Sequence, residues 1–261
     1  MSEAGKDRTL GGKGIVVTRP AHQAAPLADL ICAAGGRALA FPAIEIADVA
    51  DTRALYAVID RLDEFDRAIF VSPNAVHQAL PIITARRGLP PALRYAAVGR
   101  ASVRELAKFG VTDVAVPARF DSESLLALPE LTRVAGQRLV IFRGVGGRDV
   151  LGQTLAARGA HVEYAECYRR LLPRVNPAPL LHAWAAHEIH AVTVTSSEGL
   201  RNFCELIGAQ GRAPLQQTPV FVPHPRIAAT ARELGLSAVV ETAQGDGGLV
   251  AGLQRWFAAH C

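Results

Sequence analysis

An internal repeat constrains this chain of 261 residues more than any other feature. Three separated segments recur about 124 residues further on. They are 14–20 with 138–144, 69–74 with 192–197, and 104–110 with 229–235. A repeat this long indicates a duplicated domain rather than a solenoid. We therefore expect two similar domains with a cleft between them, which is a usual place for a ligand.

Short apolar strands alternate with amphipathic helices along the chain. Several strands are continuous runs of Val, Ile and Ala, which is typical of parallel strands buried on both faces. The pattern predicts strands at 14–18, 37–41, 68–72, 95–98, 113–116, 138–142, 161–168, 191–195, 219–222 and 238–241. It predicts helices at 21–34, 51–62, 74–86, 101–109, 122–128, 148–158, 179–188, 198–207, 226–234 and 246–259. Five βα units in each copy indicate an α/β fold with two flavodoxin-like, doubly wound parallel-sheet domains.

Local signals mark the ends of these elements. Glycines follow helices as C-terminal stops at Gly35, Gly110, Gly159, Gly208 and Gly235. Asp51, Asp121 and Asp246 stand where N-caps or near-caps belong. Two corresponding extended segments, 41–46 and 162–170, are long, and Pro42 disfavours a central strand position. We expect these two segments to bridge from one sheet to the other.

Composition excludes several classes of protein. The chain is 50% hydrophobic and has a net charge of +4. It has neither a run of ~20 apolar residues nor a basic stripe interleaved with aromatics, so we expect no membrane span and no nucleic-acid partner. Residues 1–13 are polar and lack a signal-peptide core, which predicts a flexible tail on a cytoplasmic protein. The four cysteines form no CxxC pair, and we expect no disulfide.

A set of short motifs runs in order from about residue 14 to residue 257. They are VTRP at 17–20, FPAI at 41–44, FVSPNAV at 70–76, AVG at 97–99, SESLL at 122–126, FRG at 142–144 followed by Gly147 and Arg148, YRR at 168–170 and TSSE at 195–198. In order and spacing they resemble the uroporphyrinogen-III synthase family, the cofactor-free cyclases of tetrapyrrole biosynthesis. No single motif carries the resemblance; the full set does.

The resemblance implies interleaved domains. One would comprise 1–39 plus 171–261 and the other 44–166, with linkers at about 40–43 and 167–170 that form a two-stranded connection. Two crossings of the chain also imply a hinge, with open and closed forms. Because the cleft already accounts for the duplication, we expect a monomer.

The resemblance also implies a substrate and a reaction. The substrate would be hydroxymethylbilane, a linear tetrapyrrole with eight carboxylates. Loss of its terminal hydroxyl leaves an azafulvene, which the last pyrrole ring attacks through its substituted carbon. The spiro intermediate then fragments and recloses with that ring inverted, as uroporphyrinogen III. Such an enzyme mainly controls geometry, so we expect no metal and no cofactor. A transient contact with hydroxymethylbilane synthase is the expected protein partner.

Carboxylates need donors, and parallel α/β sheets supply them where helices begin beyond strand ends. The candidate loops are 19–22, 72–75, 99–102, 143–148, 195–198 and 223–227. The candidate substrate-binding residues are Arg19, Ser72, Asn74, Gly99, Ser102, Ser122, Arg143, Gly144, Arg148, Thr195, Ser196, Ser197 and Arg226. Ser102 stands where the family usually has threonine.

Each candidate has a simpler alternative. The hydroxyl and amide residues are good helix N-caps, and the glycines suit turns. Arg19 and Arg143 could pair with linker carboxylates such as Glu45 or Glu166. Tyr168 is the candidate acid for departure of the hydroxyl, directly or through a water, and the alternative is a packed linker tyrosine.

Two other functions fit parts of the sequence. A non-catalytic bilobal protein that closes over an anionic small molecule would use the same repeat and cleft. A nucleotide-dependent α/β enzyme would need a phosphate or dinucleotide fingerprint, and Gly144–Gly147 does not complete GxGxxG.

Overall fold

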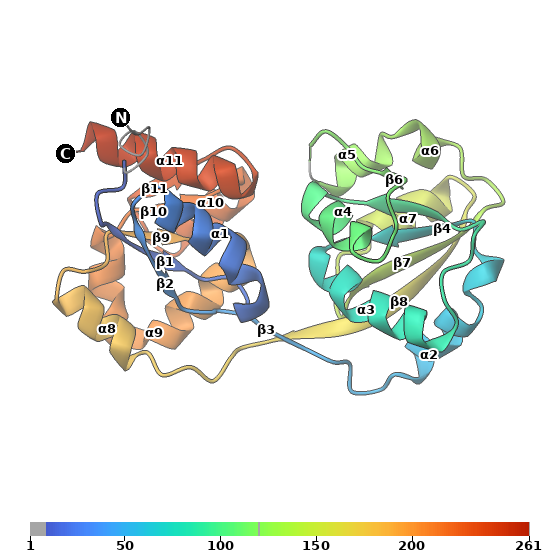
Figure 1. The fold of residues 1–261 in the computed structure, drawn as a ribbon, viewed down its shortest axis with the longest axis horizontal. Coiled ribbons are helices and arrows are strands. Elements are labelled where there is room, and N and C mark those ends of the chain that lie inside the picture. Colours follow the sequence, from blue (N-terminus) through green and yellow to red (C-terminus); the bar gives the residue numbers. More distant parts are fainter. Residues whose placement is uncertain (1–8, 120, 261) are drawn as a thin grey trace, which may run out of the picture. The chain divides into compact units, whose positions relative to one another are not determined.

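A computed structural model describes residues 9–119 and 121–260 (Figure 1). The chain divides into two compact units. The first runs to Glu45 and resumes at Leu171, and the second is Ile46–Arg170. No helix in the described ranges combines the length and the apolar character that a membrane crossing requires.

The first unit is built on a five-stranded parallel sheet. Its strands lie in the order β2 (Arg37–Ala40), β1 (Gly14–Val17), β9 (Ala191–Thr193), β10 (Val220–Val222) and β11 (Val239–Glu241). Reading these strands in chain order gives 2-1-3-4-5, the flavodoxin-like order. The expected fold class is therefore present in this unit.

Helices cover both faces of this sheet (Figure 1). Successive strand residues face opposite sides of a sheet, so Val16 and Val17 are both fully buried because both faces are covered. The face of Val17 packs on α1 (Ala21–Ala33) and α11 (Gly245–Ala259). The face of Val16 packs on α8 (Ala178–Ala185), α9 (Ser197–Gln217) and α10 (Pro225–Glu233). This double cover explains the continuous apolar strands.

The second unit is built on a six-stranded sheet. Its order is β3 (Glu45–Ala47), β8 (His161–Leu171), β7 (Arg138–Gly144), β4 (Arg67–Phe70), β5 (Arg94–Ala97) and β6 (Val114–Ala115). The strands from β8 to β6 are parallel neighbours. Phe70 and Phe142 stack across β4 and β7 with ring centroids 4.7 Å apart.

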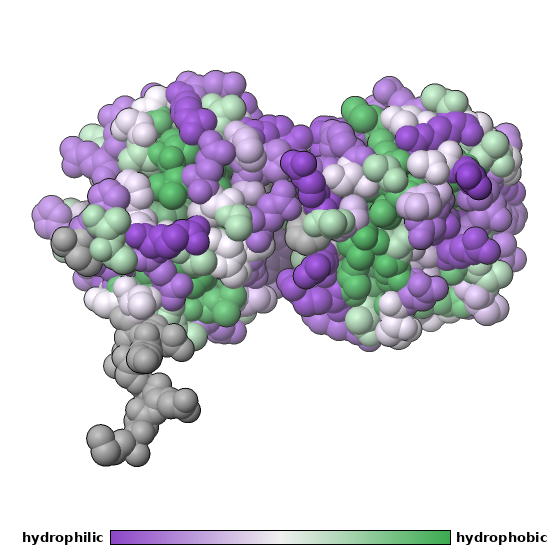
Figure 2. All heavy atoms as spheres, turned by 90° about the horizontal axis from the view of Figure 1, so that it is seen from above, coloured by the Kyte–Doolittle hydropathy of each residue, from purple (hydrophilic) through white to green (hydrophobic). Residues whose placement is uncertain are grey.

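Helices again form two layers around this sheet. One layer contains α2 (Arg53–Asp60), the 3₁₀ turn η1 (Leu62–Glu64), α3 (Pro73–Arg86) and α4 (Arg100–Ala107). The other contains α5 (Ser122–Leu126), α6 (Pro129–Thr132) and α7 (Val150–Ala157). On the face of each unit that Figure 2 shows, hydrophilic residues surround smaller apolar areas.

The two sheets have matching topologies once the repeat is taken into account. The order β8-β7-β4-β5-β6 equals β2-β1-β9-β10-β11 if β7 corresponds to β1 and β4 to β9. Gly35 and Gly159 share left-handed φ values of 81° and 86°, and Gly110 and Gly235 share values of 80° and 83°. Each unit therefore takes strands from both copies of the repeat.

The first passage between units lies at Glu45–Ile46, beyond the linker 40–43 predicted from the sequence, and the first unit resumes at Leu171. Phe41 and Ala43, expected in the first linker, are buried in the first unit, where Phe41 meets Phe203 edge to face. Cys167 and Tyr168, expected in the second, are buried in the second unit. Apolar burial draws these segments into the cores, so the divisions fall inside the neighbouring strands β3 and β8.

One local expectation needs correction, and several short elements were missed. Leu10 is fully buried, so residues 9–13 are not a free tail, and residues 1–8 lie outside the described part. The predicted stop at Gly208 is present, because its φ of 58° breaks the helical geometry there, and a second helical segment that the sequence patterns missed continues α9 to Gln217. The sequence patterns also missed β3 and α6, which are too short to show a period.

Candidate functional site

Helices begin beyond the carboxyl ends of the strands in both units. In the second unit, Ser72 caps α3, and its Oγ accepts the Ala75 N–H at 3.1 Å. Gly99 is the N-cap of α4 and has no side-chain acceptor. Asp121 caps α5 by accepting the Ser124 N–H at 2.7 Å, as the sequence predicted. The N-termini of α3 and α4, which have no acidic residue in the first turn, favour anionic ligands.

Tyr168 joins two of the predicted loops in the second unit. The Tyr168 side chain is buried, and its Oη lies 3.0 Å from Ser72 Oγ. Its ring lies against Gly144, where an added Cβ would come within 2.7 Å of the ring carbons Cε2 and Cζ. Arg170 Nη1 donates to Tyr168 Oη at 3.5 Å. The structure thus brings together Ser72, Gly144 and Tyr168, and it adds Arg170, which the sequence had shown only as part of the YRR motif.

Arg143 is held by carboxylates, as the structural alternative for it predicted. Its guanidinium donates to Asp149 Oδ1 at 2.6 Å and to Glu166 Oε1 at 3.1 Å, and it lies over the Tyr164 ring. Burial alone would lower the pKa of Arg143, but the hydrogen bonds to Asp149 and Glu166 outweigh it and raise the pKa. Arg143 also donates to the Gly147 carbonyl, so its main effect is to order the loop after β7.

The remaining candidates in the second unit differ in accessibility. Arg148 is exposed and lies 3.8 Å from Glu123, a long surface ion pair that adds little stability. Asn74 and Ser122 are half-buried in the first turns of α3 and α5. Ser102, however, is only 2% exposed in α4. Its small side chain packs inward, so the expected ligand contact of Ser102 is not supported.

The first unit carries the equivalent helix starts. Ser196 caps α9 by accepting the Gly199 N–H at 3.0 Å, and Ser197 Oγ accepts the Thr230 hydroxyl at 2.9 Å. Thr195 is half-buried just before this cap. The N-cap of α10 is His224, whose Nδ1 accepts the Arg226 N–H. Two flanking prolines were the sequence signal that this residue starts a helix.

The two arginines of the first unit have different environments. Arg19 forms an ion pair with Asp246 at 2.5 Å, and both side chains are largely buried. The pairing alternative for Arg19 therefore holds with a different partner, Asp246 of α11 instead of Glu45 or Glu166. Arg226 is exposed, and no salt bridge to it is found within the described residues. Of these two, Arg226 is the more available for a ligand carboxylate.

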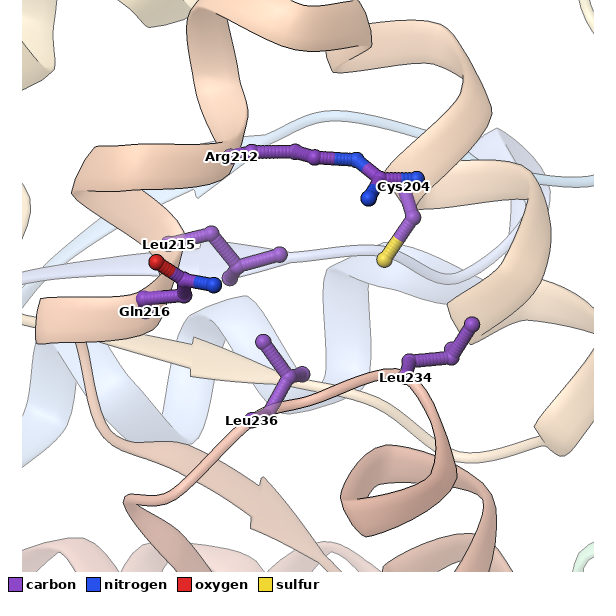
Figure 3. Close-up of a pocket in the computed structure, with 6 residues that line it drawn as sticks. All are labelled: Cys204, Arg212, Leu215, Gln216, Leu234 and Leu236. Atoms are coloured by element: carbon purple, nitrogen blue, oxygen red, sulfur yellow. The ribbon is translucent and has the colours of Figure 1, made fainter.

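A small pocket in the first unit lies away from these helix starts. Its lining comes from α9 and from the segment that ends α10, and Figure 3 shows the six residues Cys204, Arg212, Leu215, Gln216, Leu234 and Leu236. Burial raises the pKa of the Cys204 thiol. Three of these six residues are leucines and Arg212 alone among them is charged, so the lining offers a polycarboxylate few donors.

Cys167 neighbours Tyr168 and is expected to be inert in the folded protein. Burial raises the pKa of its thiol to about 12, and Sγ lies 3.4 Å from the Arg143 carbonyl. Because the thiolate is the reactive form, we expect iodoacetamide at pH 8 to modify the exposed Cys32 and to spare Cys167 until the protein unfolds. Peptide mapping after alkylation would check this, and rapid modification of Cys167 in folded protein would contradict it.

The raised thiol pKa also sets a pH dependence. The proton on Cys167 is held more tightly in the folded state than at its ordinary pKa of 9.0. Its contribution to stability is therefore complete below pH 9, and it is lost as the pH rises toward 12.

The described part of the chain contains no group of three or more His, Cys, Asp or Glu side chains placed to hold a metal ion. The fold and the site thus define a two-unit α/β protein with anion-attracting helix starts and a buried hydroxyl pair. The family model for uroporphyrinogen-III synthase HemD matches residues 25–251. The chain belongs to the uroporphyrinogen-III synthase family.

Individual relatives agree with this assignment. The uroporphyrinogen-III synthase of Salmonella typhimurium is 36% identical over 224 residues, which cover 85% of this chain and 91% of the relative. That of Synechococcus elongatus is 30% identical over 261 residues, with 96% and 97% coverage. A crystal structure of a mutant uroporphyrinogen III synthase from Thermus thermophilus superposes with a TM-score of 0.61 at 19% identity, covering 95% of this chain and 99% of that one. At that identity the structural likeness supports the fold alone.

Proposed function

We propose that this protein converts hydroxymethylbilane into uroporphyrinogen III, with loss of water and inversion of the terminal pyrrole ring. The observation that carries the proposal is the hydroxyl pair of Ser72 and Tyr168, placed where α3 begins beyond β4. It provides a proton donor next to a helix N-terminus that attracts carboxylates. We propose that no cofactor takes part, because the reaction needs only an acid and a controlled geometry.

Binding of the substrate is assigned to the helix starts and to exposed cationic side chains. The N-termini of α3, α4, α9 and α10 present backbone N–H groups of the kind that hold carboxylates. Arg148 and Arg226 are exposed and add charge-assisted donors. Asn74, Gly99, Ser122 and the segment 195–197 complete the proposed set. Because many donors contribute to binding of the substrate carboxylates, a single substitution among them should weaken binding only modestly.

Tyr168 is assigned the role of general acid. Its O–H would protonate the leaving hydroxyl of the substrate, which departs as water and leaves a phenolate and the electrophilic azafulvene protonated on its ring nitrogen. The proton is returned when the carbon that closes the ring loses its hydrogen. We expect Tyr168→Phe to lower kcat about a hundredfold, the usual contribution of one such group, while the thermal unfolding temperature changes little. An unchanged initial rate of cyclisation would remove this role.

The experiment that tests the function separates the product isomers. Hydroxymethylbilane is generated in situ with its synthase, this protein is added, and the oxidised uroporphyrins are separated. Predominant isomer III supports the cyclase. Isomer I alone, with folded protein, would reject it, because spontaneous closure keeps the ring uninverted, and would favour a bilobal binding protein. We propose a cytoplasmic monomer that receives its substrate in a transient contact with hydroxymethylbilane synthase. Sedimentation with and without that enzyme tests both points.

A further inference from the structure

The repeat provides an internal comparison for the Ser72–Tyr168 pair. Ser72 and Ser196 lie 124 residues apart, and each caps its helix by accepting the N–H of the residue three positions later. That residue is Ala75 for Ser72 and Gly199 for Ser196. The equivalent of Ser72 is therefore Ser196, one residue beyond the Thr195 that sequence comparison had paired with it.

The residue that faces the cap differs between the units. Tyr168 lies beside Ser72 in the second unit, and the same offset places Ile44 in the first. Ile44 is buried, and its Cδ1 would lie 3.5 Å from a Cβ on Gly199, in the first turn of α9. Ser196 thus caps its helix beside an apolar side chain, whereas Ser72 caps its helix beside a phenol. The acid chemistry is confined to one of two similar helix starts.

We propose that Ser72 and Arg170 are positioning residues for the Tyr168 hydroxyl, a conclusion that rests on the proposed function. Ser72 Oγ already accepts the Ala75 N–H, which leaves one lone pair and one rotatable O–H facing Tyr168 Oη. Arg170 Nη1 is a second hydrogen-bond partner of the Tyr168 hydroxyl and donates to its Oη. The two hydroxyls carry two hydrogen atoms, and only one of them lies in the hydrogen bond between Ser72 Oγ and Tyr168 Oη. The other hydrogen is therefore available to a ligand.

The same arrangement supports the state after proton transfer. When Tyr168 gives its proton to the departing hydroxyl, a phenolate oxygen remains. Ser72 O–H and the Arg170 guanidinium can then both donate to that oxygen. Neither group has to move far, because Ser72 Oγ lies 3.0 Å and Arg170 Nη1 lies 3.5 Å from it. Preoriented donors of this kind stabilise charge that develops during a reaction. Ser72 and Arg170 therefore act through Tyr168 rather than on the substrate.

A double-mutant cycle tests this proposal, with the repeat as its matched control. Ser72→Ala and Ser196→Ala each remove one N-cap hydrogen bond, so their costs in thermal stability should be alike. Ser72→Ala should lower kcat about tenfold when Tyr168 is present and less than about twofold in Tyr168→Phe protein. Ser196→Ala should change kcat and KM by the same factor in both backgrounds. Ser72→Thr keeps the hydroxyl and should restore most of kcat.

Arg170→Gln supplies the second arm of the cycle. It should lower kcat in the presence of Tyr168 and leave kcat unaffected in Tyr168→Phe protein. If Ser72→Ala and Arg170→Gln each lowered kcat by the same factor with and without the Tyr168 hydroxyl, the positioning role would be overturned. The acid role of Tyr168 would survive that result. Full activity of Tyr168→Phe would instead remove the acid role itself. The two failures are therefore distinguishable.

Discussion

Replacing Gly144 by alanine is expected to lower kcat about a hundredfold, as much as removing the Tyr168 hydroxyl. The new Cβ would lie 2.7 Å from two ring carbons of Tyr168 and 3.2 Å from Arg170 Nη1. The ring is 3% exposed and packed in the core of the second unit, so it has little room to move without shifting its hydroxyl from Ser72. The glycine is required by a neighbouring side chain and not by its own backbone angles.

Steady-state kinetics and thermal unfolding together check this prediction. Overpacking of this kind should cost about 1–3 kcal/mol of unfolding free energy, while a folded protein remains for assay. In Tyr168→Phe protein the same Gly144→Ala change should still lower stability, because the phenyl ring still clashes, but should add little to the loss of kcat. Wild-type turnover in folded Gly144→Ala protein would show that the position of Tyr168 does not matter.

Gly14→Ala is expected to produce the largest loss of stability, about 3 kcal/mol of unfolding free energy. Gly14 begins β1. A Cβ there would overlap the Glu188 carbonyl oxygen and would lie 3.1 Å from Leu39 Cδ1. Two hydrogen bonds to His190 hold the backbone in place: Gly14 N donates to Nδ1, and the Gly14 carbonyl accepts the His190 N–H. Backbone atoms must therefore move to admit one methyl group.

Hydrogen exchange can locate this loss. We expect faster exchange in β1, β2 and β9 of the first unit and unchanged protection in the second, together with a fall in unfolding temperature of about 10 °C. Gly247→Ala is the matched control, because its Cβ would meet nothing within 4 Å. That variant should be as stable as the parent protein or slightly more so. An equal loss in both variants would mean that the contact with Glu188 is not the cause.

Local sequence signals predicted most of the fold because they act over short distances. Continuous Val and Ile runs indicated strands covered on both faces, and β1 and β10 are fully buried as expected. Glycines at Gly35 and Gly110 ended helices through left-handed angles that other residues rarely adopt. The repeat itself predicted matching topologies, and the strand orders of the two sheets agree with it.

Pairings of distant residues could not be predicted in this way. Arg19 forms its ion pair with Asp246, which lies 227 positions further along the chain. Ser72 is the N-cap of α3 and Ser102 lies in the first turn of α4, yet Ser72 meets Tyr168 and Ser102 is buried. A sequence pattern places a residue at a helix start, but the rotation of that helix against its sheet decides what its side chain contacts.

The sequence by itself determined the duplication, the alternation of strands and helices and the family, because periodicity and motif order survive in one dimension. Only the tertiary structure decided that Arg143 orders a loop through Asp149 and Glu166, and that Ser72 acquires a phenol partner while Ser196 acquires none among the described residues. The physical reason is that hydrogen bonds and packing depend on distances of a few ångströms between residues that the chain itself keeps far apart.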